Sequence, residues 1–287
     1  MASLRETKDR IESVRSTLKI TSAMKLVASS KLRKAQNAIE SLRPYEEAMM
    51  SILRASSGGV RKAAQTVQVS EDGGQVESAG RFAIVAIASN SSLCGAFNSN
   101  VIKKVLELTA RHPDAVVFGL GRKMADALKR AGLPSPGDYS PLVAKPAYES
   151  AGQLARELCD GYDEGRFSNV VLVYNHFVST SRQEVRVEDY LPFVNDSDSE
   201  TGIEEGYYIY EAGAGEIVSE LLPKLVRLKL FAAVLDSAAA EHAARTVAMQ
   251  TATDNAGELL SDLTLEYNKG RQQKITAEIL ELVGGQQ

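Results

Sequence analysis

The stretch LRETKDRIESVRSTLKITSAMKLVASSKLRKAQNAIESL, residues 4–42, carries the strongest structural signal in the chain, because its apolar and small residues recur every seven positions. Two such sets interleave: Leu4, Ile11, Leu18, Lys25, Leu32 and Ile39, and Val14, Thr21, Ala28, Ala35, Leu42 and Met49. This spacing is typical of the two seams of a heptad. A long helix cannot bury such seams by itself, so the stretch predicts a helical partner.

The C-terminal part of the sequence supplies a matching stripe. Between Lys224 and Val283 there is no proline, and the only glycines are Gly257 and Gly270. Steps of three and four residues connect Leu228, Phe231, Leu235, Ala238, His242, Arg245, Met249, Ala252, Ala256, Leu259 and Leu263. Unbroken patterns longer than about 25 residues favour a coiled coil over ordinary core helices, which are the alternative. The small seam residues predict a close approach of the two helices.

The middle of the chain has a different period. Short apolar runs at 81–88, 115–120 and 169–174 are typical of buried parallel strands, and helical patterns at 98–111, 122–131 and 148–162 separate them. Segments 183–193 and 207–211 alternate as further strands, possible antiparallel additions to the sheet. The predicted fold class is α/β, or α+β by some schemes: a small Rossmann-like domain combined with a long antiparallel coiled coil.

This pattern divides the chain into four parts. We predict an N-terminal coiled-coil helix at 1–57, a linker at 58–80, a central α/β domain at 81–212 and a C-terminal coiled-coil helix at 213–287. The linker is polar and rich in glycine.

Composition limits the possible partners. The chain has 287 residues, 44% of them hydrophobic, and a net charge of -4, which argues against a generally basic nucleic-acid binder. Its charge is uneven, since no acid interrupts a basic band at Arg15, Lys19, Lys25, Lys31, Arg33 and Lys34. The band indicates an acidic partner surface or, alternatively, a solvated helix face.

The use of cysteine indicates a reducing compartment, and the hydropathy of the chain indicates no membrane-spanning segment. The two cysteines have no disulfide or zinc spacing, and we expect no cofactor and no metal. No apolar run reaches 18 residues, and the N-terminus has no signal-peptide core. Association with a membrane is therefore expected only through a partner, without direct insertion.

Three short motifs suggest chemistry but fit structural roles better. Gly119 and Gly121 lack the third glycine of a dinucleotide fingerprint. Cys94, in a turn at 92–98, could be a nucleophile at a helix start; a tight turn shaped by Gly95 and capped by Asn98 or Ser99 is the preferred interpretation. The acidic loop at 196–200 lacks the glycine and glutamate positions of a calcium loop.

Three sequence stretches resemble signatures of one family. ITSAMKLVASSKL, residues 20–32, resembles the N-terminal signature of the gamma subunit of F-type ATP synthases. EHAAR at 241–245, together with AM at 248–249, ATDNA at 252–256 and YNKGRQ at 267–272, is similar to its C-terminal signature, and LCG at 93–95 resembles its central turn. The resemblance covers the whole chain in the right order.

The resemblance implies a function in a rotary motor. Gamma subunits are central rotor shafts, inserted into a ring of alpha and beta subunits and resting on a ring of c subunits beside epsilon. Proton flow turns the c ring, and the asymmetric shaft drives the beta subunits through their catalytic states. The resemblance thus implies a non-catalytic subunit, without a cofactor, that is peripheral to the cytoplasmic face of a bacterial plasma membrane.

The resemblance also implies contact residues. Met24 and Lys25 match a contact with an acidic loop of beta, and Arg271, Gln272 and Thr276 match positions that meet its catch loop. Tyr208 and Glu211 match a region that contacts epsilon and the c ring. Two positions depart from the family pattern: Gly270 replaces a small alanine, and Ser22 stands where lysine is common.

Two other classes of function remain open at this point. A free-standing coiled-coil scaffold could bind an acidic protein or a nucleic acid through the basic band. An α/β enzyme could use Cys94. The scaffold would not need a ring of alpha and beta subunits, and the enzyme would need its thiol.

Overall fold

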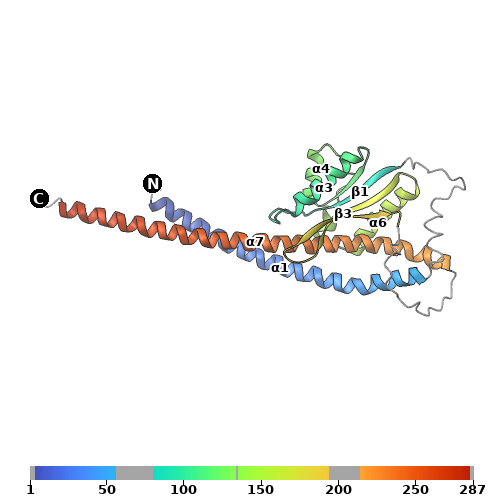
Figure 1. Cartoon of the computed structure of the whole chain (residues 1–287), viewed down its shortest axis with the longest axis horizontal. Coiled ribbons are helices and arrows are strands. Elements are labelled where there is room, and N and C mark those ends of the chain that lie inside the picture. Colours follow the sequence, from blue (N-terminus) through green and yellow to red (C-terminus); the bar gives the residue numbers. More distant parts are fainter. Residues whose placement is uncertain (1–3, 56–79, 134, 194–213, 285–287) are drawn as a thin grey trace. The chain divides into compact units, whose positions relative to one another are not determined.

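The computed structural model describes residues 4–55, 80–133, 135–193 and 214–284 (Figure 1). Two helices account for the long terminal stretches: α1, Leu4–Ala55, and α7, Ala214–Gly284. The chain forms two compact units, one of Met1–Ser30 with Arg245–Gln287 and one of Lys31–Ala244. Both long helices contribute residues to each unit.

The first unit is an antiparallel pair of helices. A Cβ at Gly270 would lie 3.2 Å from Leu4 Cδ2, and one at Gly257 would lie 3.9 Å from Leu18 Cδ1. Residue numbers therefore rise along α1 as they fall along α7. Every predicted heptad position of α1 in this unit is buried or half-buried, namely Leu4, Ile11, Val14, Leu18, Thr21, Lys25 and Ala28. The heptad prediction is confirmed here.

The predicted stripe of α7 is wrong at Leu259, which is 48% exposed. After Ala256 the covered face continues through Leu260, Leu263, Tyr267 and Gly270. A helix has about 3.6 residues per turn, so a stripe can step by three or by four at any point. The position of the partner helix decides which step is used.

The second unit contains a four-stranded sheet in the order β2-β1-β3-β4. Its strands are β1, Arg81–Ile87; β2, Val116–Leu120; β3, Phe167–Phe177; and β4, Gln183–Leu191. β1 pairs in parallel with β2 and β3, and β4 pairs antiparallel with β3. The predicted parallel strands and the added antiparallel strand at 183–193 are confirmed.

Helices cover both faces of this sheet (Figure 1). α3, Phe97–Arg111, and α4, Arg122–Arg130, pack on one face through Val101, Val105, Met124 and Leu128. α6, Tyr148–Asp163, packs on the other face together with α7. The α7 residues in this cluster are Val226, Leu230, Ala233 and Val234. Part of α7 is therefore a member of the α/β layers.

In this unit α7 is buried on a second face by α1. Leu225 and Leu228 pack with Met49 and Leu53, and Ala239 and Ala243 pack with Leu32 and Ala35. These contacts are again antiparallel. The predicted stripe is right at Leu228, but Phe231 packs against the sheet-side cluster, and Ala239 and Ala243 contact α1 in place of the predicted Ala238 and His242. The face of α7 toward the sheet was not predicted.

The remaining differences from the sequence predictions are local. β3 is longer than the predicted 169–174, and the short helix α5, Ser140–Ala144, was not predicted. Segments 196–200 and 207–211 lie outside the described residues. The boundaries at 57/58 and 212/213 also lie outside them, so the four-part domain division stays a prediction.

Candidate functional site

The end of α7 offers an extended surface. Residues 271–281 are all exposed, including Arg271, Gln272 and Thr276. The described part of α1 begins at Leu4, which lies against Gly270, and so provides no seam for the turns that follow. Within this surface the Thr276 hydroxyl donates to the Gln272 carbonyl at 2.9 Å. The other side-chain groups of these three residues face solvent and are available to a partner.

Large apolar side chains are exposed on the same unit. Leu26 is 68% exposed and Leu265 69%, and Ile20, Val27, Ile275, Ile279 and Leu280 are exposed as well. These residues lie outside the seam between the helices. These side chains give the paired helices apolar area that a partner could cover.

The basic band begins on this unit with Arg15, Lys19 and Lys25. Within the described chain, the structure gives these three side chains no ion pair or hydrogen bond. Met24 and Lys25 are half-buried, and their neighbours Leu26 and Val27 are exposed. The predicted contact residues Met24 and Lys25 are thus followed directly by two exposed apolar side chains. Tyr208 and Glu211 lie outside the described residues.

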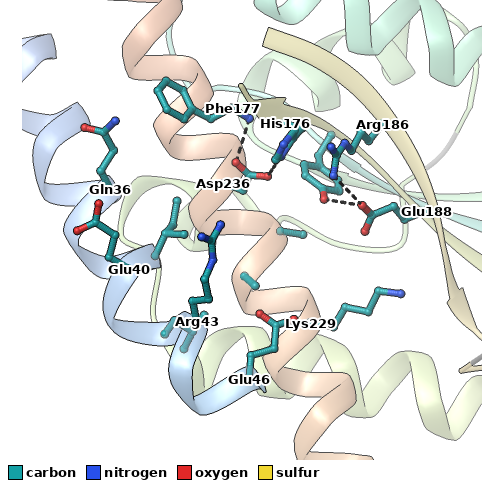
Figure 2. Close-up of a pocket in the computed structure, with 15 residues that line it drawn as sticks. Gln36, Glu40, Arg43, Glu46, His176, Phe177, Arg186, Glu188, Lys229 and Asp236 are labelled. Atoms are coloured by element: carbon teal, nitrogen blue, oxygen red, sulfur yellow. Dashed lines mark hydrogen bonds and ion pairs between the residues drawn. The ribbon is translucent and has the colours of Figure 1, made fainter. Parts of the chain in front are cut away.

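A polar groove lies in the second unit, between α1, α7 and the β3–β4 pair (Figure 2). Its volume is about 390 Å³. On the sheet side the Tyr174 hydroxyl donates to Glu188 at 3.0 Å, and Arg186 lies 3.8 Å from the same carboxylate. The polar side chains of Tyr174, Arg186 and Glu188 on the sheet side of the groove therefore have partners among themselves.

The α1 wall of the groove is different. Gln36, Glu40, Arg43 and Glu46 line it, and their side chains make no hydrogen bond or ion pair with another described residue. Burial raises the pKa of Glu46, an effect that the nearby charge of Lys229 opposes. The groove separates these α1 side chains from the sheet.

The turn around Cys94 has a structural role. Cys94 is 1% exposed and packs with Phe97 and Ala240. Gly95 has a φ of 58°, as the turn interpretation requires, but the predicted cap is wrong. The residue before α3 is Ala96, without a side-chain cap, because the amide of Asn98 bonds instead to Ser89 and to Cys94 Sγ.

The two glycines of the truncated fingerprint are explained by packing. A Cβ at Gly119 would lie 2.7 Å from Leu128 Cδ1, and one at Gly121 would lie 2.2 Å from the Ala88 carbonyl oxygen. Gly121 therefore needs to be glycine for the turn between β2 and α4, while Gly119, inside β2, lets the Leu128 side chain pack closely on the strand.

Sequence reasoning missed the polar contacts of β3 and β4 with α7. Asp236 accepts from the backbone amide of Phe177 at 3.0 Å and pairs with His176. Sixty residues separate His176 from Asp236 in the chain. No sequence signal could have paired them, because the contact requires the sheet to be packed on α7.

The described residues limit two other kinds of site. No described helix is both long enough and apolar enough to cross a membrane. Among the described residues, no group of three or more histidine, cysteine, aspartate or glutamate side chains is placed to hold a metal ion.

Comparison with known proteins gives the family. A family model described as ATP synthase matches residues 3–287. A relative from Bacteroides fragilis named ATP synthase gamma chain is 44% identical over 293 residues, which cover 99% of each chain. Another of that name, from Bacteroides thetaiotaomicron, is 45% identical over 302 residues and 99% of each chain. The chain belongs to the ATP synthase gamma chain family.

Solved structures agree at the level of fold. The chain resembles a chain in the central stalk and c-ring structure of the Tetrahymena thermophila mitochondrial ATP synthase, with a TM-score of 0.56 and 22% identity over 81% of this chain and 99% of the other. It also resembles one in the rotor of the Euglena gracilis mitochondrial ATP synthase, with a TM-score of 0.61 and 18% identity over 95% and 98%.

Proposed function

We propose that the chain is the central rotor stalk of an F-type ATP synthase. It couples proton-driven rotation of a c ring to ATP synthesis and hydrolysis on alpha and beta subunits. The proposal rests on one observation above all. The paired helices of the first unit expose large apolar and unpaired basic side chains, and residues 271–281 of α7 are exposed on every side.

Such a surface is costly unless another protein covers it. Full burial of one large apolar side chain contributes about 1.5–3 kcal/mol. A rotor, however, must not bind one partner state permanently. It acts by contacting different conformations of its partners with different free energy, and thereby shifts their populations as it turns.

Electrostatic complementarity makes these contacts specific for an acidic partner surface. We assign Met24 and Lys25 to an acidic loop of beta, and Arg271, Gln272 and Thr276 to its catch loop. The unpaired cations at Arg15, Lys19 and Lys25 would meet acidic side chains, and like charges on a wrong partner would be repelled. We assign Tyr208 and Glu211 to the contact with epsilon and the c ring.

The chain itself is assigned no catalytic step. Cys94 is buried in a turn, and the chemistry is assigned to the beta and alpha subunits. We propose a location at the cytoplasmic face of a bacterial plasma membrane, reached through the c ring and epsilon and without direct insertion. The bacterial origin of the Bacteroides relatives supports this location.

Isolation from native membranes tests the proposal. We expect the chain to be recovered with stoichiometric alpha and beta subunits in a complex that pumps protons when given ATP. Recovery as a homodimer without those subunits would favour the free-standing scaffold and overturn the rotor assignment.

A surface variant tests the observation that carries the proposal. Replacing Ile275, Ile279 and Leu280 together by serine should reduce pumping or assembly. Leu106→Ser provides a matched control, because Leu106 is 40% exposed on α3 of the other unit. Equal pumping by both variants would show that the α7 end is not a contact surface.

A further inference from the structure

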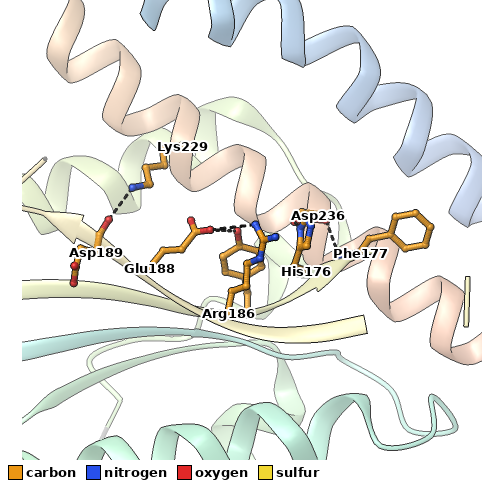
Figure 3. Close-up of polar contacts among 8 residues, drawn as sticks. His176, Phe177, Arg186, Glu188, Asp189, Lys229 and Asp236 are labelled. Carbon is orange, nitrogen blue, oxygen red and sulfur yellow. Dashed lines mark hydrogen bonds and ion pairs between the residues drawn. The ribbon is translucent and has the colours of Figure 1, made fainter. Parts of the chain in front are cut away.

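A polar clamp joins the sheet to α7. Asp236 uses both of its carboxylate oxygens: Oδ2 lies 2.5 Å from His176 Nδ1, and Oδ1 accepts the backbone N–H of Phe177 at 3.0 Å (Figure 3). The side chains of His176 and Asp236 are 27% and 17% exposed. Two consecutive residues at the end of β3 therefore hold one α7 side chain.

Two further polar links lie N-terminal to the clamp on α7. Lys229 Nζ donates to the Asp189 carbonyl at 2.7 Å, which Figure 3 also shows. The buried Tyr190 hydroxyl donates to the Val226 carbonyl at 2.9 Å. The three α7 positions are separated by three and seven residues and so lie on one side of the helix.

The groove-lining part of α1, residues 36–46, has no comparable hydrogen bond to the described part of the sheet. Its groove-lining residues Gln36, Glu40, Arg43 and Glu46 make no side-chain hydrogen bond or ion pair with other described residues, the sheet included. In the second unit α1 packs on α7 through apolar residues, and Phe177 of β3 packs against the cluster that Leu32 and Ala35 form with Ala239 and Ala243. The directional links from the sheet therefore go to α7.

The distinction matters for a part that carries torque. Apolar burial is non-directional, so it resists turning of a packed helix through the fit of side chains and not through bonds of fixed direction. Hydrogen bonds depend on distance and angle, and those to a charged carboxylate are the strong ones. Three hydrogen-bonded links on one side of α7, one of them to the Asp236 carboxylate, resist rotation of the helix about its own axis.

We propose that the α/β domain transmits torque to the helical shaft through α7, with Asp236, held by His176 and the Phe177 amide, as the principal positioning residue. This inference rests on the proposed rotor function. It assigns α7 the mechanical load and α1 the role of a packed partner.

Two replacements of Asp236 separate hydrogen bonding from packing. Leucine has the same branched side-chain skeleton as aspartate, with two larger methyl groups in place of the carboxylate oxygens, and makes no hydrogen bond. Asparagine can accept from the Phe177 amide through Oδ1 and donate to neutral His176 through Nδ2. In inverted vesicles carrying the whole complex, we expect Asp236→Leu to lower the protons pumped per ATP hydrolysed about threefold. Asp236→Asn should keep most of the coupling.

Two controls show whether a loss of coupling arises from the Asp236 contacts. The ATPase activity of the catalytic part detached from the membrane should stay at the native level in Asp236→Leu, because that activity does not need torque from the sheet. Glu40→Leu changes an unpaired carboxylate on the opposite wall of the same groove and should leave coupling unchanged. Native coupling in Asp236→Leu, or an equal loss in Glu40→Leu, would overturn the proposal.

If Asp236→Leu does not assemble into the complex, a milder variant tests the proposal. His176→Leu removes one of the two bonds and leaves the Phe177 amide on Asp236, so we expect a smaller loss of coupling in a complex that still assembles. Native coupling in this variant, with Asp236→Leu unassembled, would also contradict the clamp. Failure of the native chain to join a proton-pumping complex would instead contradict the rotor function itself.

Discussion

Gly121 lies against the carbonyl of Ala88 so closely that a Cβ on Gly121 would stand 2.2 Å from the oxygen. Its φ of 93° adds a conformation that residues with side chains rarely adopt. The same two segments are joined by the bond from the Ala88 amide to the Leu120 carbonyl, at 2.9 Å. The turn between β2 and α4 thus depends on this glycine.

We therefore expect Gly121→Ala to lower the free energy of unfolding by about 3 kcal/mol, the sum of backbone strain and overpacking. Gly132→Ala is the matched control: Gly132 has a φ of 72° but nothing within 4 Å of its added Cβ. Its loss should be about 1–2 kcal/mol from strain alone. Urea unfolding followed by circular dichroism measures both. Equal losses would contradict the close contact with Ala88.

Arg271→Ala and Gln272→Ala should each weaken ATP-driven proton pumping or assembly about fivefold, as loss of an interface side chain worth about 1 kcal/mol does. Alanine preserves the helix, and both positions are exposed, so the α/β domain should stay folded. Lys274→Ala is a control from the same turns, since Lys274 lies 3.8 Å from Glu278 on its own helix. Unchanged pumping in both test variants would count against these two contacts.

Cys94→Ser should leave ATP synthesis close to the native level. Serine is slightly smaller than cysteine and can still accept from the Asn98 amide, which lies 3.2 Å from Cys94 Sγ in the native chain. ATP synthesis by membranes carrying the variant is the measurement. An enzyme that used the Cys94 thiol would lose its activity, so that a complete loss with a correctly assembled complex would revive that alternative.

Cys159 should react with iodoacetamide more slowly than a free cysteine at neutral pH. Burial raises the pKa of its thiol to about 11, and the charges of Asp163 and Asp160 add to the effect. Because the thiolate is the reactive form, the alkylation rate should rise about tenfold per pH unit through pH 9.5. Mass spectrometry of the Cys94→Ser chain isolates this residue. The alkylation rate of a free cysteine stops rising tenfold per pH unit near its pKa of about 8.5, and the same bend in the rate for Cys159 would refute the raised pKa.

Local sequence pattern was sufficient for most elements. The heptad from Leu4 predicted α1 and its covered face, and the short apolar runs predicted β1, β2 and β3. These features depend on side-chain periodicity along a single segment. The sequence signatures also led to the gamma chain family, which the comparisons then established.

The local sequence pattern gave wrong predictions where contacts with another segment decide which residue is buried or hydrogen-bonded. Leu259 fits the stripe of α7 but is exposed, because the antiparallel helix covers Leu260 instead. Asn98 has the residue type of a helix cap, yet its amide bonds to Ser89, which is nine residues away in the chain. In both cases the local sequence allowed more than one arrangement, and tertiary packing determined which one formed.

The sequence by itself determined two long helices, the covered face of α1 and a small α/β domain, since these follow from the spacing of apolar residues along the chain. The tertiary structure alone decided that α7 also belongs to the sheet and that Asp236 meets His176 and Phe177. Those contacts join segments about sixty residues apart, and their geometry exists only after helix and sheet have packed. The contacts proposed to transmit torque are therefore contacts that no local pattern could reveal.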